Sequence, residues 1–137
     1  METITINHDI RVLYVTATSF PDGIMDAYKK LHALFPVPEI RKYYGISRPE
    51  SGVIVYKSAA EELYPGEAQK LNCNALILKS GKYIVSTIKD YMKDIQEIGR
   101  TFKELLAHPG LDPEGYCVEW YFNNKDVQCM IRILKKD

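Results

Sequence analysis

Residues 116–122 read Tyr116-Cys117-Val118-Glu119-Trp120-Tyr121-Phe122, and this run of aromatic and β-branched residues predicts a β-strand. Successive side chains of a strand point to opposite faces, so Val118 and Trp120 belong to one apolar set, while Glu119 and Tyr121 point to the other side. We expect the apolar set to face the core, with Trp120 directed toward a helix. Glu119 then lies either on a solvated surface or on the floor of a pocket.

This strand continues into a turn, residues 123–126, and a second strand, residues 127–134. A hairpin closed between Asn123 and Asp126 would set Glu119 opposite Met130 and diagonal to Arg132. The plain interpretation of Glu119 is therefore a surface carboxylate paired with Arg132, and a pocket carboxylate is the alternative. In the same register Cys117 and Cys129 would point to opposite faces, which argues against a disulfide between them.

The rest of the chain predicts two similar series of elements. The first series consists of strands at residues 4–6 and 11–17, an amphipathic helix at 24–35 stopped by Pro36 and Pro38, and strands at 43–47 and 53–57. The second consists of strands at 74–79 and 82–88 paired through Ser80-Gly81, a helix at 91–106, and the closing hairpin. Residues 58–72 between the series are expected to form a connection.

The two series align as an internal repeat, with half-repeats at about residues 3–57 and 74–134. Ile24 matches Ile95, Leu31 matches Phe102, and Gly45 falls opposite Glu119. The predicted fold is α+β: two helices on one face of an antiparallel sheet, with pseudo-twofold symmetry and a central groove on the side away from the helices. Because the acid occurs in one half only, we interpret it as a specific feature rather than a need of the scaffold.

Composition and charge narrow the function further. The 137 residues predict a single domain, residues 1–137, and eighteen basic side chains balance eighteen acidic ones, which gives no support for nucleic-acid or membrane binding. No signal peptide or transmembrane segment is recognised, so the expected location is cytoplasmic. The three cysteines and three histidines lack ligand spacing. We expect no metal and no cofactor.

The chain also holds ten tyrosines, more than a core of this size needs, since each buried hydroxyl requires a partner. Some of them should line a wet cavity beside Glu119. The candidate ligand-binding residues, chosen by strand parity and position, are Glu119, Tyr121, Tyr43, Tyr83, Tyr91 and Trp120.

Several of these residues resemble the GyrI-like effector-binding domains, the ligand-sensing modules of AraC-type and MerR-type transcription regulators. The matching features are Gly81-Lys82-Tyr83, Tyr91 followed by Glu97-Ile98-Gly99, and Glu119-Trp120-Tyr121 with Asn123 beyond. The resemblance implies a duplicated βαββ fold whose groove binds small, often aromatic or cationic, compounds, with Glu119 in the groove and aromatic side chains along its walls. No helix-turn-helix precedes Ile4, so a stand-alone module is expected.

Three functions follow as expectations. The first is a small-molecule-binding protein for an amphipathic, hydrophobic or cationic ligand, active in transcription regulation, multidrug binding or compound sequestration; no residue would be catalytic. The second is a hydrolase of reactive cyclopropane-bearing compounds, in which Glu119 would activate water. The third is a protein-interaction module with a protein partner, such as a gyrase inhibitor, since the family that the sequence resembles takes its name from a gyrase-inhibiting member. The absence of a phosphate loop, a Ser-His-Asp set or an HExxH motif favours the first.

Overall fold

The computed structural model describes residues 2–35 and 41–134. Pro36 and Pro38, which were predicted to end the first helix, lie outside the described residues. The fold is α+β, and every strand pairing that follows is antiparallel. Its elements, in chain order, are β1 (Glu2–Ile6), β2 (Ile10–Thr16), α1 (Ile24–Ala33), β3 (Tyr43–Glu50), β4 (Val53–Glu61), α2 (Glu67–Lys70), β5 (Asn74–Leu78), β6 (Gly81–Ile88), the 3₁₀ helix η1 (Tyr91–Lys93), α3 (Glu97–Leu105), β7 (Cys117–Tyr121) and β8 (Val127–Ile133).

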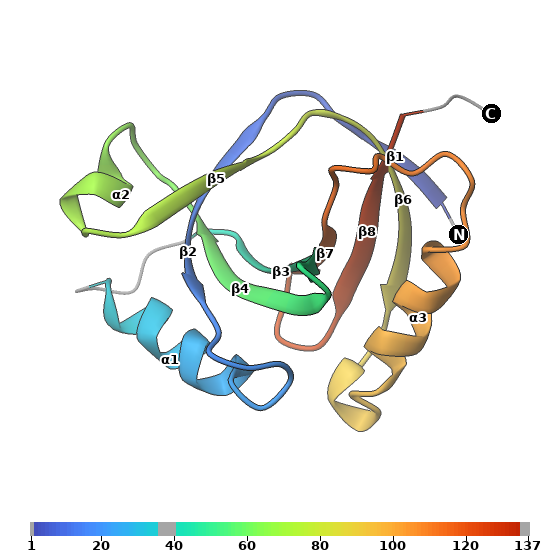
Figure 1. Ribbon diagram of the computed structural model, residues 1–137, viewed down its shortest axis with the longest axis horizontal. Helices are drawn as coiled ribbons and strands as arrows, with labels where there is room; N and C mark the ends of the chain where they lie inside the picture. Colours follow the sequence, from blue (N-terminus) through green and yellow to red (C-terminus); the bar gives the residue numbers. More distant parts are fainter. Residues whose placement is uncertain (1, 36–40, 135–137) are drawn as a thin grey trace. The chain divides into compact units, whose positions relative to one another are not determined.

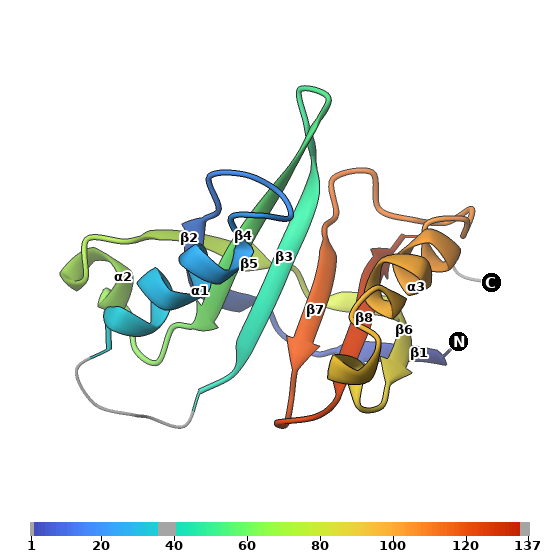
Figure 2. The same cartoon turned by 90° about the horizontal axis from the view of Figure 1, so that it is seen from below.

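The chain forms two compact units with the same internal topology. Unit 1 comprises Met1–His8 and Lys79–Asp137, and unit 2 comprises Asp9–Leu78. Unit 1 has the strand order β1-β6-β8-β7, and α3 packs on β6 and β8. Unit 2 has the order β5-β2-β4-β3, and α1 packs on β2 and β4 (Figure 1, Figure 2). The predicted βαββ duplication is therefore confirmed within each unit.

The registers of the strand pairs also match between the two units. The matching cross-strand pairs are Leu13–Ala60 and Gly45–Ser58 in unit 2, and Ile84–Ile131 and Glu119–Cys129 in unit 1. Equivalent positions of the two halves thus pair equivalently, and Gly45 is the structural counterpart of Glu119. The acid belongs to one half only, as the sequence alignment predicted.

The predicted hairpin between residues 74–79 and 82–88 is wrong. Strand β5 pairs with β2, and β6 pairs with β1, so each unit takes its edge strand from the other half of the sequence. The Ser80-Gly81 pair suggested a tight turn, yet the hydrophobic period of a strand does not reveal its partner. Both edge strands are therefore placed by long-range pairing.

Two other predicted segments differ from the structure. Residues 58–72 are not a plain connection, because β4 continues to Glu61 and α2 follows at Glu67–Lys70. The helix predicted from Tyr91 to Leu106 divides into η1 and α3. Ile95, between them, and Leu106, directly after α3, are both exposed. The division falls at Asp94, whose non-helical backbone (φ −150°, ψ 84°) ends η1 before α3 begins at Glu97.

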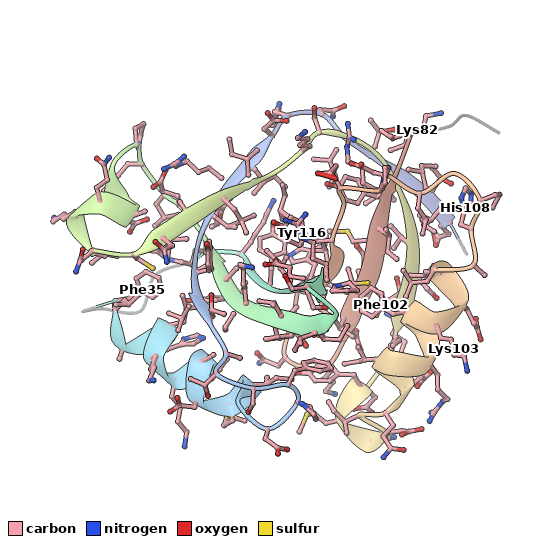
Figure 3. All side chains as sticks on the ribbon, viewed as in Figure 1. Phe35, Lys82, Phe102, Lys103, His108 and Tyr116 are labelled. Atoms are coloured by element: carbon pink, nitrogen blue, oxygen red, sulfur yellow. The ribbon has the colours of Figure 1, made fainter. Side chains whose placement is uncertain are left out.

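The core of unit 1 lies between α3 and the sheet. Phe102 points from α3 toward the strands, whereas the neighbouring Lys103 points away from them (Figure 3). The buried residues of this cluster are Ile84, Ile88, Phe102, Leu105, Val127, Cys129, Ile131 and Ile133. Side chains on the opposite face of the same sheet, such as Val85, Val118 and Met130, are also buried. Both faces of this sheet are therefore apolar, so an apolar pattern in β7 does not identify which of its faces α3 covers.

Candidate functional site

Strand β7 is the central element of the candidate site, and its register on β8 differs by one residue from the prediction. Glu119 lies opposite Cys129 rather than Met130. A shift of one residue moves the partner to the other face, so Cys117 and Cys129 share a face instead of pointing apart. The predicted pairing with Arg132 is also wrong, because Arg132 bonds Asp112 and the Ser80 carbonyl.

The orientation of β7 also corrects the placement of Trp120. Cys117 and Tyr121 pack against the cluster beneath α3, and Glu119 shares their face by its pairing with Cys129. Trp120 points to the opposite face, where its ring lies 5.5 Å from that of Phe122. The alternation of apolar residues was predicted correctly, but because both faces of the sheet are buried it could not identify the side covered by the helix.

Glu119 is a buried carboxylate that contacts one aromatic side chain, which in turn packs against a second. The residue is 8% exposed, and it accepts a hydrogen bond from the Tyr121 hydroxyl. The ring of Tyr121 is in turn 5.3 Å from the ring of Tyr91, in an edge-to-face arrangement that aromatic pairs favour. The structure therefore brings together three of the predicted site residues, Glu119, Tyr121 and Tyr91.

Two thiols, those of Cys117 and Cys129, lie on the same face of the sheet as Glu119. The sequence did not reveal this arrangement, because the predicted register of β7 on β8 was wrong by one residue. The pKa of Cys117 is raised to about 11, mainly by burial and in addition by the nearby charge of Glu119. The pKa of Cys129 is raised to about 12, mainly by burial and then by Glu119. Both thiols are neutral near pH 7. Glu119 therefore shares its face of the sheet with two neutral thiols and the rings of Tyr91 and Tyr121.

The remaining predicted residues lie elsewhere. Tyr83 is 3% exposed and donates its hydroxyl to the Lys79 carbonyl at 2.6 Å; its strand neighbour Ile84 faces α3, so Tyr83 faces the other way. Tyr43 belongs to unit 2, where its ring stacks 4.6 Å from that of His32 on α1. The predicted position of Glu119 on the side of the sheet away from the helices is wrong, because Glu119 shares the face that α3 covers. A groove that involves both units stays a prediction, as does a role for Tyr43 beside Glu119.

Within the described ranges, no group of three or more His, Cys, Asp or Glu side chains is arranged to hold a metal ion. None of the helices in that part of the chain is long and apolar enough to cross a bilayer. What the Glu119 face offers is a carboxylate, a phenol in contact with it and a second aromatic ring. Such a set can attract a cation through charge and ring faces, or it can take a proton from water.

Comparison with known proteins shows the fold and leaves the family open. Neither a protein-family model nor a curated protein matches the chain by sequence. Among solved structures, an integron cassette protein from Vibrio cholerae is similar with a TM-score of 0.73, 15% identity, and 97% and 95% of the two chains covered. The similarity is thus in the fold alone, at full length.

Two further solved structures share this fold. One is a hydrolase from Listeria innocua, with a TM-score of 0.62, 9% identity, and 97% and 90% of the two chains covered. The other is a protein called SAV2435, solved bound to tetraphenylphosphonium, with a TM-score of 0.62, 9% identity, and coverage of 97% and 93%. The fold therefore occurs both in a protein that binds a lipophilic cation and in one named as an enzyme.

Proposed function

We propose that this protein binds a small lipophilic cation, with Glu119 as the charged anchor and Tyr121 and Tyr91 as the aromatic wall. One observation carries the proposal: Glu119, which is 8% exposed, accepts a hydrogen bond from the Tyr121 hydroxyl and shares its face of the sheet with the ring of Tyr91 and two thiols. Burial of a carboxylate costs several kcal/mol, and a bound cation offsets part of that cost.

The aromatic neighbours fit the same ligand class. An aromatic ring face adds about 0.5 to 2 kcal/mol to the binding of a cation, and apolar groups of the ligand gain from removal of their surface from water. A lipophilic cation gains from both the attraction to the ring faces and the burial of apolar surface, whereas a metal ion or ammonium gains only from the attraction. The binding of tetraphenylphosphonium to a protein of similar fold supports this choice of ligand class. It is also consistent with the GyrI-like resemblance of the sequence.

Calorimetric titration with tetraphenylphosphonium tests the proposal. The wild-type protein should bind it, and Glu119→Gln, which keeps the size of the side chain, should weaken binding by about tenfold or more, the effect of losing one charge contact. Glu104→Gln is the matched control, since it removes an exposed carboxylate from α3. Equal affinity of the wild type and Glu119→Gln would refute the anchor role.

A second candidate function is hydrolysis of reactive cyclopropane-bearing compounds. Glu119 in its buried setting would take a proton from the water that attacks a cyclopropane carbon. The ring C–C bond would break, and the departing carbon would receive that proton. Tyr121 would orient the carboxylate by its hydrogen bond. The hydrolase of similar fold favours keeping this candidate. Incubation with such a compound and product analysis would decide. Turnover that is the same with wild type and Glu119→Ala would remove it.

A further inference from the structure

Unit 1 contains a polar cluster where the turn between β7 and β8 meets the chain leaving β6. Asp126 is its centre. Its Oδ1 accepts a hydrogen bond from the backbone N–H of Asp90 at 2.9 Å. Its Oδ2 accepts one from the side-chain amide of Asn123 at 3.0 Å and lies 3.5 Å from Lys89 Nζ. One side chain therefore joins its own turn to a segment 36 residues away.

A second bond runs beside the first and involves the backbone alone. The N–H of Tyr91 donates to the carbonyl oxygen of Lys125 at 2.9 Å. Two successive N–H groups, those of Asp90 and Tyr91, are thus held by two successive residues of the turn, Asp126 and Lys125. This arrangement fixes both the position and the direction of the chain as it enters η1.

The turn itself is built to hold this shape. Asn123 Oδ1 accepts hydrogen bonds from the N–H groups of Lys125 at 2.7 Å and Asp126 at 2.8 Å, the pattern of an Asx turn. With the same side chain bonded to Asp126 Oδ2, the carboxylate has little freedom. Contacts within the turn therefore hold the Asp126 carboxylate in place for the Asp90 N–H.

The tethered segment needs such contacts. Asp90 has a left-handed backbone conformation (φ 57°), which residues with a side chain adopt where surrounding contacts hold them. Tyr91 follows directly, and its ring lies edge-on against Tyr121, whose hydroxyl bonds Glu119. Asp90 therefore directly precedes the ring that packs against the hydrogen-bond partner of Glu119.

We infer that Asp126 is a positioning residue that holds Tyr91 against Tyr121 and so sets the aromatic wall beside Glu119. The consequence for ligand binding rests on the proposed function, whereas the tether itself does not. The ligand class whose affinity should depend on this wall is the aromatic cation, since it uses the ring of Tyr91 as well as the charge of Glu119.

Amide hydrogen exchange measured residue by residue in the full chain tests the tether without any ligand. Asp126→Ala should speed exchange of the Asp90 and Tyr91 amides by about tenfold or more, while the β6 and β8 amides keep their rates. Asp126→Asn retains an oxygen for the Asp90 N–H and should restore most of the protection. Lys89→Ala removes only an exposed ion pair and should leave it intact. Unchanged exchange in Asp126→Ala would overturn the inference.

A double-mutant cycle with tetraphenylphosphonium tests the consequence. Asp126→Ala and Tyr91→Ala should each weaken binding by about three- to tenfold, the size of one aromatic contact, and the double variant should be no weaker than Tyr91→Ala. Additive losses, or full affinity in Asp126→Ala, would overturn the positioning role. If the wild type binds no such cation, the proposed function fails, and the exchange experiment still decides whether Asp126 holds Tyr91.

Discussion

Glu119 and Cys129 are directly paired across strands β7 and β8, on the face of the sheet that packs under α3. The pairing places a carboxylate next to a fully buried thiol, and Cys117 lies on the same face two residues before the acid. The charge of Glu119 raises the pKa of both thiols, in addition to the larger effect of burial. The thiols can therefore report on the charge state of the acid.

Replacement of Glu119 by Gln should make Cys117 more reactive toward iodoacetamide. Removal of a neighbouring negative charge stabilises the thiolate, so the pKa of Cys117 falls from about 11, and alkylation at a fixed pH below it becomes several-fold faster. Cys117 is the thiol to follow, because it is partly exposed whereas Cys129 is buried. Mass spectrometry of Cys117 against time measures the rate. Glu97→Gln is the control, because Glu97 is not among the causes of the raised pKa of Cys117 and its removal should leave that rate unchanged. Identical rates in Glu119→Gln and wild type would contradict the described environment.

Phe102 should be a main contributor to the stability of unit 1. It is 8% exposed and packs from α3 onto the strands, so Phe102→Ala should lower the free energy of unfolding by about 3 to 5 kcal/mol. Leu106, one turn later and 54% exposed, is the matched control, and Leu106→Ala should change stability by less than about 0.5 kcal/mol. Urea unfolding followed by circular dichroism distinguishes them. Equal effects would mean that α3 packs through a different face.

Replacement by Ala should have opposite effects on stability at two glycines of unit 1. Gly99 lies inside α3 with nothing within 4 Å of an added Cβ, so Gly99→Ala should stabilise the protein by about 0.5 to 1 kcal/mol. Gly81 has φ +130°, and an added Cβ would lie 3.2 Å from Arg132 Nε, so Gly81→Ala should destabilise it. Thermal unfolding midpoints of the two variants provide the test. A lower midpoint for Gly99→Ala would show that this position has a contact outside the helix.

In unit 2, the buried ion pair of Glu67 with Arg41 should make stability depend on pH. Burial raises the pKa of Glu67, but hydrogen bonds from Arg41 at 3.0 and 2.9 Å and from the Leu63 N–H outweigh it and lower the pKa below 4.5. A lowered pKa in the folded state means that the stabilisation is present above the unfolded value and is lost as the pH falls through the folded value.

Glu67→Gln should therefore cost about 3 to 5 kcal/mol near pH 7, because a buried guanidinium loses its carboxylate, and less at about pH 3. The control is Asp26→Asn, which removes an exposed pair with Lys30 and should cost no more than about 0.5 kcal/mol. Urea unfolding at both pH values gives the difference. A cost that does not shrink at low pH would show that Glu67 acts through packing rather than charge.

The elements were easier to predict than their pairings, for a physical reason. The period of 3.6 in residues 24–35 and the alternation in residues 116–122 come from local burial, and both segments form the predicted type of structure. The partners of β1 and β5 depend on residues far away in the sequence, so the local Ser80-Gly81 signal was misleading.

The candidate site was predicted in part. The alternation of side chains along one strand is enough to place Glu119 and Tyr121 on the same face, and their hydrogen bond confirms that they are neighbours. The hairpin register could not be read from the turn residues, and an error of one residue hid the two thiols. The tether from Asp126 to Asp90 joins residues 36 apart, and no pattern in either segment indicates the other.

The binding of two ions of opposite charge and nearly equal shape tests the central claim most directly. Tetraphenylphosphonium and tetraphenylborate each carry four phenyl groups, so they differ chiefly in the sign of the charge that meets Glu119. Titration of the wild-type protein should give binding of the cation and at least about tenfold weaker binding of the anion, and Glu119→Gln should abolish the preference. Equal affinities for the two ions in the wild type, or a preference that survives in Glu119→Gln, would contradict a cation site anchored by Glu119.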